Sequence, residues 1–266
     1  MDHPTCPVGT ENPSEAERQT TFPSATPHWP ALLLVGPTGA GKTPLGEELA
    51  RRGLTGRRTV HFDFGAQLRQ MVECPPPNLL APPEILFLKD VLATGALLED
   101  QHFPLAGKIL RWFISRTQLG SGEWLILNGL PRHRGQAKAM EGLVSVAAVV
   151  ELVCPAEVVL QRIQSNAGGD RAGRVDDDLP LVQRKLEIYH SRTRPLIDFY
   201  RELGTPVIPL NVGPATTAAE LATTLEAHLH QVLGAPGNIE PAPKLWSLPN
   251  DQRALGELTF PEFFSR

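Results

Sequence analysis

The sequence lacks several features that would assign it to whole classes of protein. It has only three cysteines, Cys6, Cys74 and Cys154, which lie far apart and form no metal-binding or redox spacing. Such sparse use of cysteine is typical of a reducing compartment. An excess of basic charge is also missing, because 25 Lys and Arg face 29 Asp and Glu, for a formal net charge of -4. A mildly acidic chain has no global attraction for nucleic acid or an acidic membrane, so any basic site has to be local.

Long apolar runs are missing as well. None in the sequence reaches the roughly 20 residues that cross a bilayer, and the N-terminal stretch has no apolar core of a signal peptide. We therefore predict a cytoplasmic protein whose partners are small molecules, with no nucleic acid and no membrane, and we expect a monomer. The 266 residues are enough for one large domain or two small ones with a sizeable core.

Composition divides the chain into three parts. Residues 1–29 are polar and proline-rich, and we expect them to be disordered. Residues 30–234 carry the regular pattern of a folded domain. From 235 to 266 the composition turns proline-rich again, and this C-terminal extension ends near the apolar string FPEFF.

Short apolar runs alternate with helical stretches in the central part. Five of them are too short for a helix and are bounded by glycine, proline or charge: 31–35, 59–64, 124–128, 146–153 and 206–211. Continuous apolar strands between helices are typical of a parallel sheet that is covered on both faces. The sequence therefore predicts an α/β fold with a five-stranded parallel sheet flanked by helices.

Helical patterns follow most of these runs. The stretch 178–204 is long, and we expect it to bend at Pro195. Between the second and third strands, residues 65–121 are too many for a simple crossover and include helical strings such as PPEILFLKDVLATG, so they predict a subdomain. The other predicted helices are 44–53, 132–143, 156–165 and 216–234.

The string GPTGAGKT, residues 36–43, matches the Walker A pattern and stands between an apolar strand and a helix. Its glycines let successive N–H groups face phosphate oxygens, and the helix N-terminus adds the positive end of a dipole. The lysine of this string would reach the β- and γ-phosphates, and the threonine hydroxyl would bind Mg²⁺. We therefore predict an ATP and Mg²⁺ site made by Gly36, Gly39, Ala40, Gly41, Lys42 and Thr43.

The Walker A loop does not identify the phosphate acceptor, but other strings resemble a known family. LNGLPRHRGQA (127–137) is similar to the LDGFPRxxxQA segment of adenylate kinases. AGRVDDDLPLVQRKLEIYHSRTRPLIDFY (172–200) is similar to the segment at the edge of their lid, and HFDFGAQLRQMV (61–72) is a weaker match to their HISTGDLLR. The likeness runs from about 30 to 233 in the same order, so the chain resembles nucleoside monophosphate kinases of the short-lid type.

This resemblance implies a P-loop NTPase fold with a helical NMP-binding arm, about 65–121, and a short lid without zinc cysteines, about 164–175. It implies transfer of the γ-phosphoryl group of ATP to a nucleoside monophosphate, with AMP preferred. Two other functions stay open. One is a kinase for another acceptor such as UMP or CMP, and the other is a weakly catalytic nucleotide-binding protein that acts through its tails.

The resemblance also assigns roles to single residues on the acceptor side. Arg69 and Arg132 match arginines that grip the acceptor phosphate, and Gln136 matches the glutamine that reads the adenine of AMP. Arg174 matches a lid arginine that clamps the transferring group, and Arg162 matches an arginine of the ATP site. Two carboxylates that position lid arginines on closure correspond to Asp176 and Asp177.

Two departures from the family pattern concern catalysis. Asn128 stands where the family has an aspartate that holds Mg²⁺ through water. Lys185 stands where it has a catalytic arginine, with Arg184 one residue earlier, and lysine lacks the bidentate fork of arginine. With these substitutions the implied catalytic set is Lys42, Arg132, Arg174 and Lys185.

Two further departures concern binding. Asn166 replaces a lid arginine, for which Arg171 would compensate. Phe64 and Ala66 replace the threonine and aspartate of the arm motif, and Asp63 lies nearby but out of register.

Overall fold

The computed structural model describes residues 29–120, 122–170 and 179–233. The predicted C-terminal extension and almost all of the predicted N-terminal tail lie outside these residues, as do Arg171, Arg174, Asp176 and Asp177 of the predicted lid region. The first strand begins at Trp29, one residue before the predicted start of the domain.

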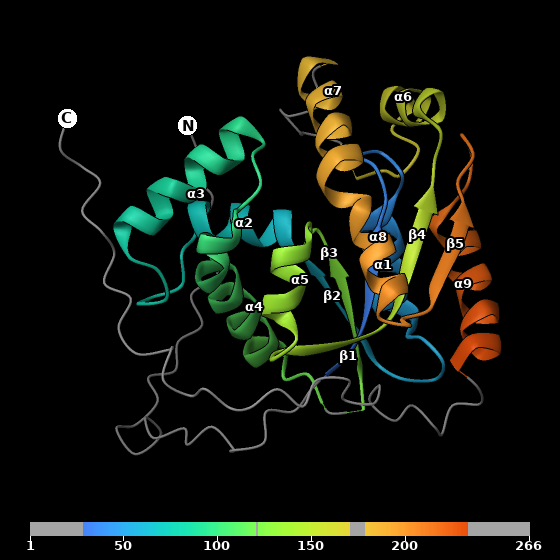
Figure 1. Ribbon diagram of the computed structural model, residues 1–266, viewed down its shortest axis with the longest axis horizontal. Helices are drawn as coiled ribbons and strands as arrows, with labels where there is room; N and C mark the ends of the chain where they lie inside the picture. The colour runs from blue at the N-terminus through green and yellow to red at the C-terminus, as the bar shows by residue number, and fades with distance from the viewer. Residues whose placement is uncertain (1–28, 121, 171–178, 234–266) are drawn as a thin grey trace.

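Five strands form one parallel sheet, which confirms the predicted fold class. Across the sheet their order is β2-β3-β1-β4-β5 (Figure 1), and each neighbouring pair is parallel. The central strand is β1, so the loop that follows it lies in the middle of the carboxyl edge of the sheet. The strands are β1 (Trp29–Val35), β2 (Thr59–Asp63), β3 (Trp124–Asn128), β4 (Val144–Val153) and β5 (Val207–Asn211).

Helices cover both faces of the sheet (Figure 1). Leu32 and Leu34 of β1 pack in one core with side chains of α1 and α9, whereas Leu33 and Val35 pack in a second core with α4, α5 and α8. Every side chain from Ala31 onward in β1 is buried because both faces are covered. In chain order the helices are α1 (Lys42–Arg52), α2 (Phe64–Glu73), α3 (Pro82–Thr94), the 3₁₀ turn η2 (Asp100–His102), α4 (Phe103–Thr117), α5 (Arg134–Met140), α6 (Ala156–Ser165), α7 (Leu179–Ile188), the π-helical turn η3 (Tyr189–Thr193), α8 (Pro195–Glu202) and α9 (Ala218–Leu233).

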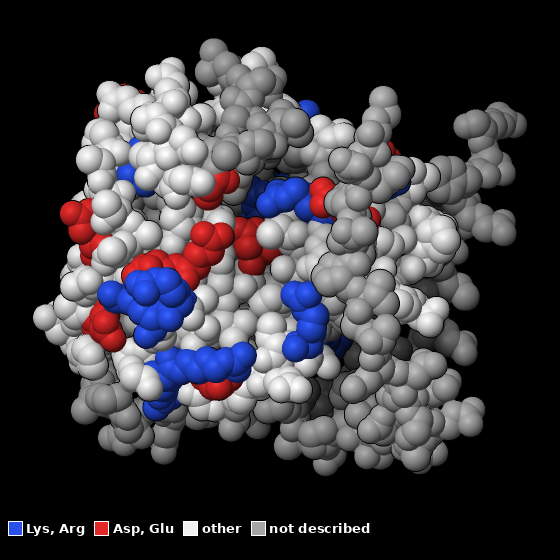
Figure 2. Space-filling view, turned by 180° about the vertical axis from the view of Figure 1, so that it is seen from behind, with Lys and Arg blue, Asp and Glu red and all other residues white. Residues whose placement is uncertain are grey.

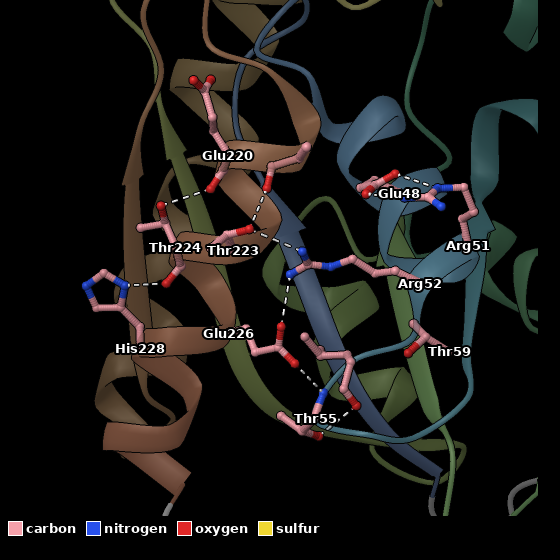
Figure 3. Close-up of polar contacts among 12 residues, drawn as sticks. Glu48, Arg51, Arg52, Thr55, Thr59, Glu220, Thr223, Thr224, Glu226 and His228 are labelled. Atoms are coloured by element: carbon pink, nitrogen blue, oxygen red, sulfur yellow. Dashed lines mark hydrogen bonds and ion pairs between the residues drawn. The ribbon is translucent and has the colours of Figure 1, made fainter.

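Hydrogen bonds and an ion pair join α9, the last described helix, to α1 and the loop after it (Figure 3). Arg52 donates from Nη2 to a carboxylate oxygen of Glu226 at 3.1 Å and from Nη1 to the hydroxyl of Thr223 at 3.2 Å. The backbone N–H of Thr55 donates to the other Glu226 oxygen at 3.0 Å. These contacts fix α9 to the helix that leads away from the Walker A loop.

The segment between β2 and β3 is helical, as predicted, and forms an arm beside the β2 edge of the sheet (Figure 1). Leu88 and Val91 of α3 join the core. An ion pair of 2.9 Å between Lys108 of α4 and Glu84 of α3 joins these two helices. We use the name "arm" for α2, α3 and η2 with the loops between them.

The long helix predicted for 178–204 is interrupted. The described part begins as α7, widens into the π-helical turn η3, and continues as α8 from Pro195. The N–H of Arg194 donates to the carbonyl of Tyr189 at 2.7 Å, which is a five-residue step. The predicted bend therefore lies just before the proline, which cannot itself donate a hydrogen bond.

In the described part of the chain, no helix is long and apolar enough to cross a membrane. On the face seen in Figure 2, acidic and basic side chains lie beside one another, in line with the nearly balanced composition. Cys154 is a free thiol, whereas Cys74 is disulfide-bonded. The compartment stays a prediction.

Candidate functional site

The Walker A loop has the backbone geometry that phosphate binding needs. Gly41 precedes α1 with a φ of 95°, a left-handed conformation that favours glycine. A Cβ on Gly36 would lie 3.0 Å from the Cβ of Leu152 on β4, so this position is also closed to larger residues. The loop therefore turns directly from β1 into the N-terminus of α1, where N–H groups and the helix dipole favour an anion.

Lys42 lies at the start of α1 with its ammonium group over the loop. Its Nζ donates to the carbonyl oxygens of Gly36 at 2.8 Å and Pro37 at 2.7 Å. Both acceptors belong to the loop that would surround the phosphates. The cation is therefore held at the position where transferred negative charge would have to be neutralised.

The ends of three neighbouring elements meet beside Lys42. The hydroxyl of Thr43 donates to Oδ2 of Asp63, the last residue of β2, at 2.6 Å. Nδ2 of Asn128, the last residue of β3, donates to the same oxygen at 2.8 Å and lies 3.1 Å from the Thr43 hydroxyl. The other carboxylate oxygen, Oδ1, accepts from the N–H of Ala66 at 2.9 Å and so caps α2.

This corner has the oxygen groups that Mg²⁺ prefers, a hydroxyl and a carboxylate. No group of three or more His, Cys, Asp or Glu that could hold a metal occurs in the described residues. Mg²⁺ at nucleotide sites needs no such cage, because it keeps water ligands and binds one or two protein groups together with phosphate oxygens. The residues therefore fit a nucleotide-bound Mg²⁺, which supplies charge neutralisation at the β- and γ-phosphates.

A cavity of about 230 Å³ opens at this edge of the sheet, between the Walker A loop, the arm and α7. Its described lining contains four cations and two carboxylates, a formal excess of two positive charges in a chain with a net charge of -4. The basic site is therefore local, as the nearly balanced composition requires of any such site. The charged lining residues are Lys42, Arg69, Arg132, Lys185, Asp63 and Asp170.

Arg132 and Gln136 lie on the side of the cavity that faces the arm. Burial lowers the pKa of Arg132 to about 10, and no ion pair to this arginine is seen among the described residues. The side chain of Gln136 is buried, its Oε1 accepts from the N–H of Arg132 at 2.8 Å, and its Nε2 donates to the carbonyl of Leu98 at 2.8 Å. Since an amide nitrogen carries two hydrogens, one of them remains for a ligand.

Comparison with known proteins gives the family. A search of family models found no match. The chain is 34% identical over 178 residues to the adenylate kinase of Xylella fastidiosa (strain M12), an alignment that covers 65% of this chain and 86% of that protein. It is 33% identical to the adenylate kinase of Xanthomonas campestris pv. campestris (strain 8004) with the same coverage. It is 32% identical to that of Stenotrophomonas maltophilia (strain K279a), over 65% of this chain and 87% of that protein.

The chain belongs to the adenylate kinase family. The resemblance inferred from the sequence is thereby confirmed, and it supports a nucleotide kinase. Among solved structures, the chain is similar to an unliganded sugar kinase from Janibacter sp. HTCC2649. The superposition covers 79% of this chain and 97% of the sugar kinase chain, with a TM-score of 0.45 and 18% identity. That likeness is too weak to bear on the function.

The structure brings most of the residues matched to adenylate kinases into one cavity. Two others are not among its lining residues: Ala40 is fully buried, and the guanidinium of Arg162 donates to the backbone carbonyls of Gly39 and Gly213. A contact of Arg162 with nucleotide stays a prediction. The predicted residues that line the cavity are Gly36, Gly39, Gly41, Lys42, Thr43, Arg69, Arg132, Gln136 and Lys185.

Lys185 of α7, which the resemblance pairs with a catalytic arginine of the family, is a lining residue of the cavity. Lys185 lines it, whereas the neighbouring Arg184 is exposed. A Cβ on Gly95, in the arm, would lie 4.0 Å from Cε of Lys185. The pairing of Lys185 with the family's arginine stays a prediction.

Asp63 and Thr193 are two of the lining residues that were not predicted as site residues. Asp63 was noted only as out of register with the family motif, although its place near the end of a predicted strand was a usable signal. Thr193 lines the cavity from η3, and its hydroxyl is buried without a hydrogen-bond partner among the described residues. A π-helical turn at this point was not readable from the apolar pattern, although such turns are frequent at functional sites.

Proposed function

We propose that the protein transfers the γ-phosphoryl group of ATP to a nucleoside monophosphate, with AMP as the preferred acceptor. One observation carries the proposal. Lys42 of the Walker A loop and two arginines of the opposite side, Arg69 and Arg132, line a single cavity. Two nucleotides bound tail to tail would place their phosphates between these cations.

Alignment and charge neutralisation account for most of the catalysis of phosphoryl transfer. In this proposal Lys42 and Thr43 hold the ATP side with Mg²⁺, and Arg69 and Arg132 hold the acceptor phosphate. Lys185 and Arg174 neutralise charge on the transferring group. Within the described part of the chain nothing pairs with the partly buried guanidinium of Arg132, and such a group favours an anionic ligand.

Preference for AMP rests on Gln136. The remaining hydrogen on its Nε2 could be donated to an acceptor nitrogen of adenine. The replacements at Phe64 and Ala66 favour the open alternative, a kinase for UMP or CMP. Turnover with ATP and each of AMP, UMP, CMP and GMP in turn separates the two acceptor classes.

A coupled assay at millimolar ATP and AMP tests the reaction itself. We expect Lys42→Ala to lower turnover by at least about a hundredfold, because it removes a cation from the transferred charge. Lys89→Ala, at an exposed position of α3, is the matched control and should leave turnover unchanged. Equal activity of the parent and Lys42→Ala would contradict the proposed site.

A second candidate is a nucleotide-binding protein with little catalysis. Two substitutions support this candidate. Asn128 stands where the family has a charged aspartate, and Lys185 stands where it has an arginine with a bidentate fork. Tight binding of ADP, measured by calorimetry, together with turnover below detection for all four acceptors would favour it.

A further inference from the structure

The last residues of β2 and β3 lie side by side. Asp63 and Asn128 are direct partners in the register of these parallel strands. The family resemblance places an acid at position 128, and this chain has a neutral amide there and an acid one strand further out. The two adjacent strand ends therefore still carry one carboxylate between them. It lies on β2, at Asp63, and not on β3, at position 128.

The contacts of Asp63 direct its carboxylate to the Walker A threonine. Oδ2 lies 2.6 Å from the hydroxyl of Thr43 and 2.8 Å from Nδ2 of Asn128, both of which donate to it. Asn128 is buried, so its amide is fixed by these two neighbours. Its role here is to hold the Asp63 oxygen close to Thr43.

We infer that Asp63 is the carboxylate that supports the nucleotide-bound Mg²⁺, in place of an acid at position 128, and that Asn128 is its positioning residue. The inference rests on the proposed function, because it needs nucleotide at the Walker A loop. Asp63 provides the negative charge and the acceptor oxygen that an asparagine at 128 does not. Thr43 and Asp63 would then hold the ion from two elements, α1 and β2.

The substitution Asp63→Asn isolates the charge. Asn is as good an N-cap as Asp, so the capping bond to Ala66 at the start of α2 can be kept while the charge is lost. The probe is Mn²⁺, a paramagnetic substitute for Mg²⁺, titrated into the ADP complex of the full chain and followed by electron paramagnetic resonance. We expect Asp63→Asn to weaken Mn²⁺ binding by about 10- to 100-fold.

Two controls accompany this measurement. Asp198→Asn, at an exposed position of α8, should bind Mn²⁺ like the parent. The affinity for ADP without metal, measured by calorimetry in EDTA, should be the same in the parent and in Asp63→Asn to within about threefold, because the carboxylate acts through the ion. A parent that binds no ADP under these conditions would overturn the proposed function, and this inference with it.

The double variant Asp63→Asn/Asn128→Asp returns the carboxylate to β3. If the two strand ends are equivalent supports, it should regain Mn²⁺ affinity to within about threefold of the parent. Mn²⁺ binding in Asp63→Asn within about twofold of the parent would overturn the inference. So would a drop in metal-free ADP affinity as large as the drop in Mn²⁺ affinity, because it would show a distorted loop instead of a lost metal support.

Discussion

The guanidinium of Arg162 donates from Nε to the carbonyl oxygen of Gly39 at 3.2 Å, and so fixes the backbone of the Walker A loop. From Nη1 it also donates to the carbonyls of Gly213 at 2.8 Å and Thr216 at 2.9 Å. The side chain is only 3% exposed. Arg162 therefore joins the loop after β1 to the loop after β5 through backbone carbonyls of both.

We expect Arg162→Met to lower the free energy of unfolding by about 2–4 kcal/mol, because it leaves several loop carbonyls without a charged donor. In a domain of this size the melting temperature should fall by roughly 5–10 °C. Arg201→Met, at an exposed position of α8, should change stability by less than about 1 kcal/mol. An unchanged melting temperature, together with an ATP affinity at least about tenfold weaker, would instead assign Arg162 to nucleotide binding.

Arg132→Met should affect the two nucleotides differently. We expect about a hundredfold loss in kcat/KM for AMP, because a charge-assisted contact to the acceptor phosphate is removed. ATP affinity, measured by calorimetry in the absence of AMP, should change little. Equal losses for both nucleotides would place Arg132 between the two phosphate sites.

The same variant should be more stable than the parent when no nucleotide is present. Burial lowers the pKa of Arg132 to about 10 from a reference value of 12.5, so the folded state disfavours the charged side chain. The charged Arg132 therefore lowers the free energy of unfolding, and this loss of stability is fully present below pH 10. Above pH 10 the folded chain loses the proton while the unfolded chain keeps it, so the free energy of unfolding rises with pH and the loss fades. Removing the charge should raise stability by about 1–2 kcal/mol at pH 8, and thermal melts of both proteins at pH 8 and pH 10.5 should show the difference shrinking.

Lys185 and Arg184 make a matched pair on α7. Lys185→Ala should lower kcat by about tenfold or more, whereas Arg184→Ala should retain it, because only the former lines the cavity. Lys185→Arg should raise kcat with little change in the KM for AMP, since the fork of arginine would hold the transferring group more firmly. Saturation kinetics with ATP and AMP measures all three, and an inactive Arg184→Ala beside an active Lys185→Ala would reverse the assignment.

Gly46 of α1 lies directly against the imidazole ring of His61 on β2, and a Cβ at this position would overlap the ring. Ala is usually better than Gly in a helix by about 1 kcal/mol. Gly46→Ala should nevertheless destabilise the protein by about 1–3 kcal/mol, because the ring is largely buried and has to move. Gly107→Ala in α4 is the control: its Cβ would meet neighbours at 3.5 Å or more, so it should be neutral or stabilising in urea denaturation.

His61→Ala in the Gly46→Ala background should recover part of the loss, since it removes the group that the new methyl meets. Additive effects of the two substitutions would show that the ring is not the obstacle.

Local pattern predicted several elements closely. The strand 124–128 and the helix 156–165 have the observed bounds, because each is an uninterrupted apolar or amphipathic run with clear ends. The second strand ends one residue earlier than predicted. Asp63 caps α2 with its side chain, so Phe64 is already helical although it is apolar like a strand residue.

From the residues alone, only the Walker A part of the site could be predicted, whereas Arg69, Arg132, Gln136 and Lys185 were assigned through the family resemblance. Gly36 to Thr43 follow from the string itself and from its place between strand and helix. The meeting of Thr43, Asp63 and Asn128 depends instead on β2 lying beside β3, a long-range pairing that residue spacing does not encode. The exposure of Arg184 and the inward placement of Lys185 depend in the same way on how α7 packs.

The position of β1 has a consequence for amide hydrogen exchange. Its amide groups are paired on both sides, with β3 and with β4, and its side chains from Ala31 to Val35 are buried in two separate cores. Protons in such a strand exchange with solvent only when the whole domain opens. The Walker A loop starts at the next residue, so the slowest-exchanging part of the chain is joined, without a linker, to the part that has to meet the ligand.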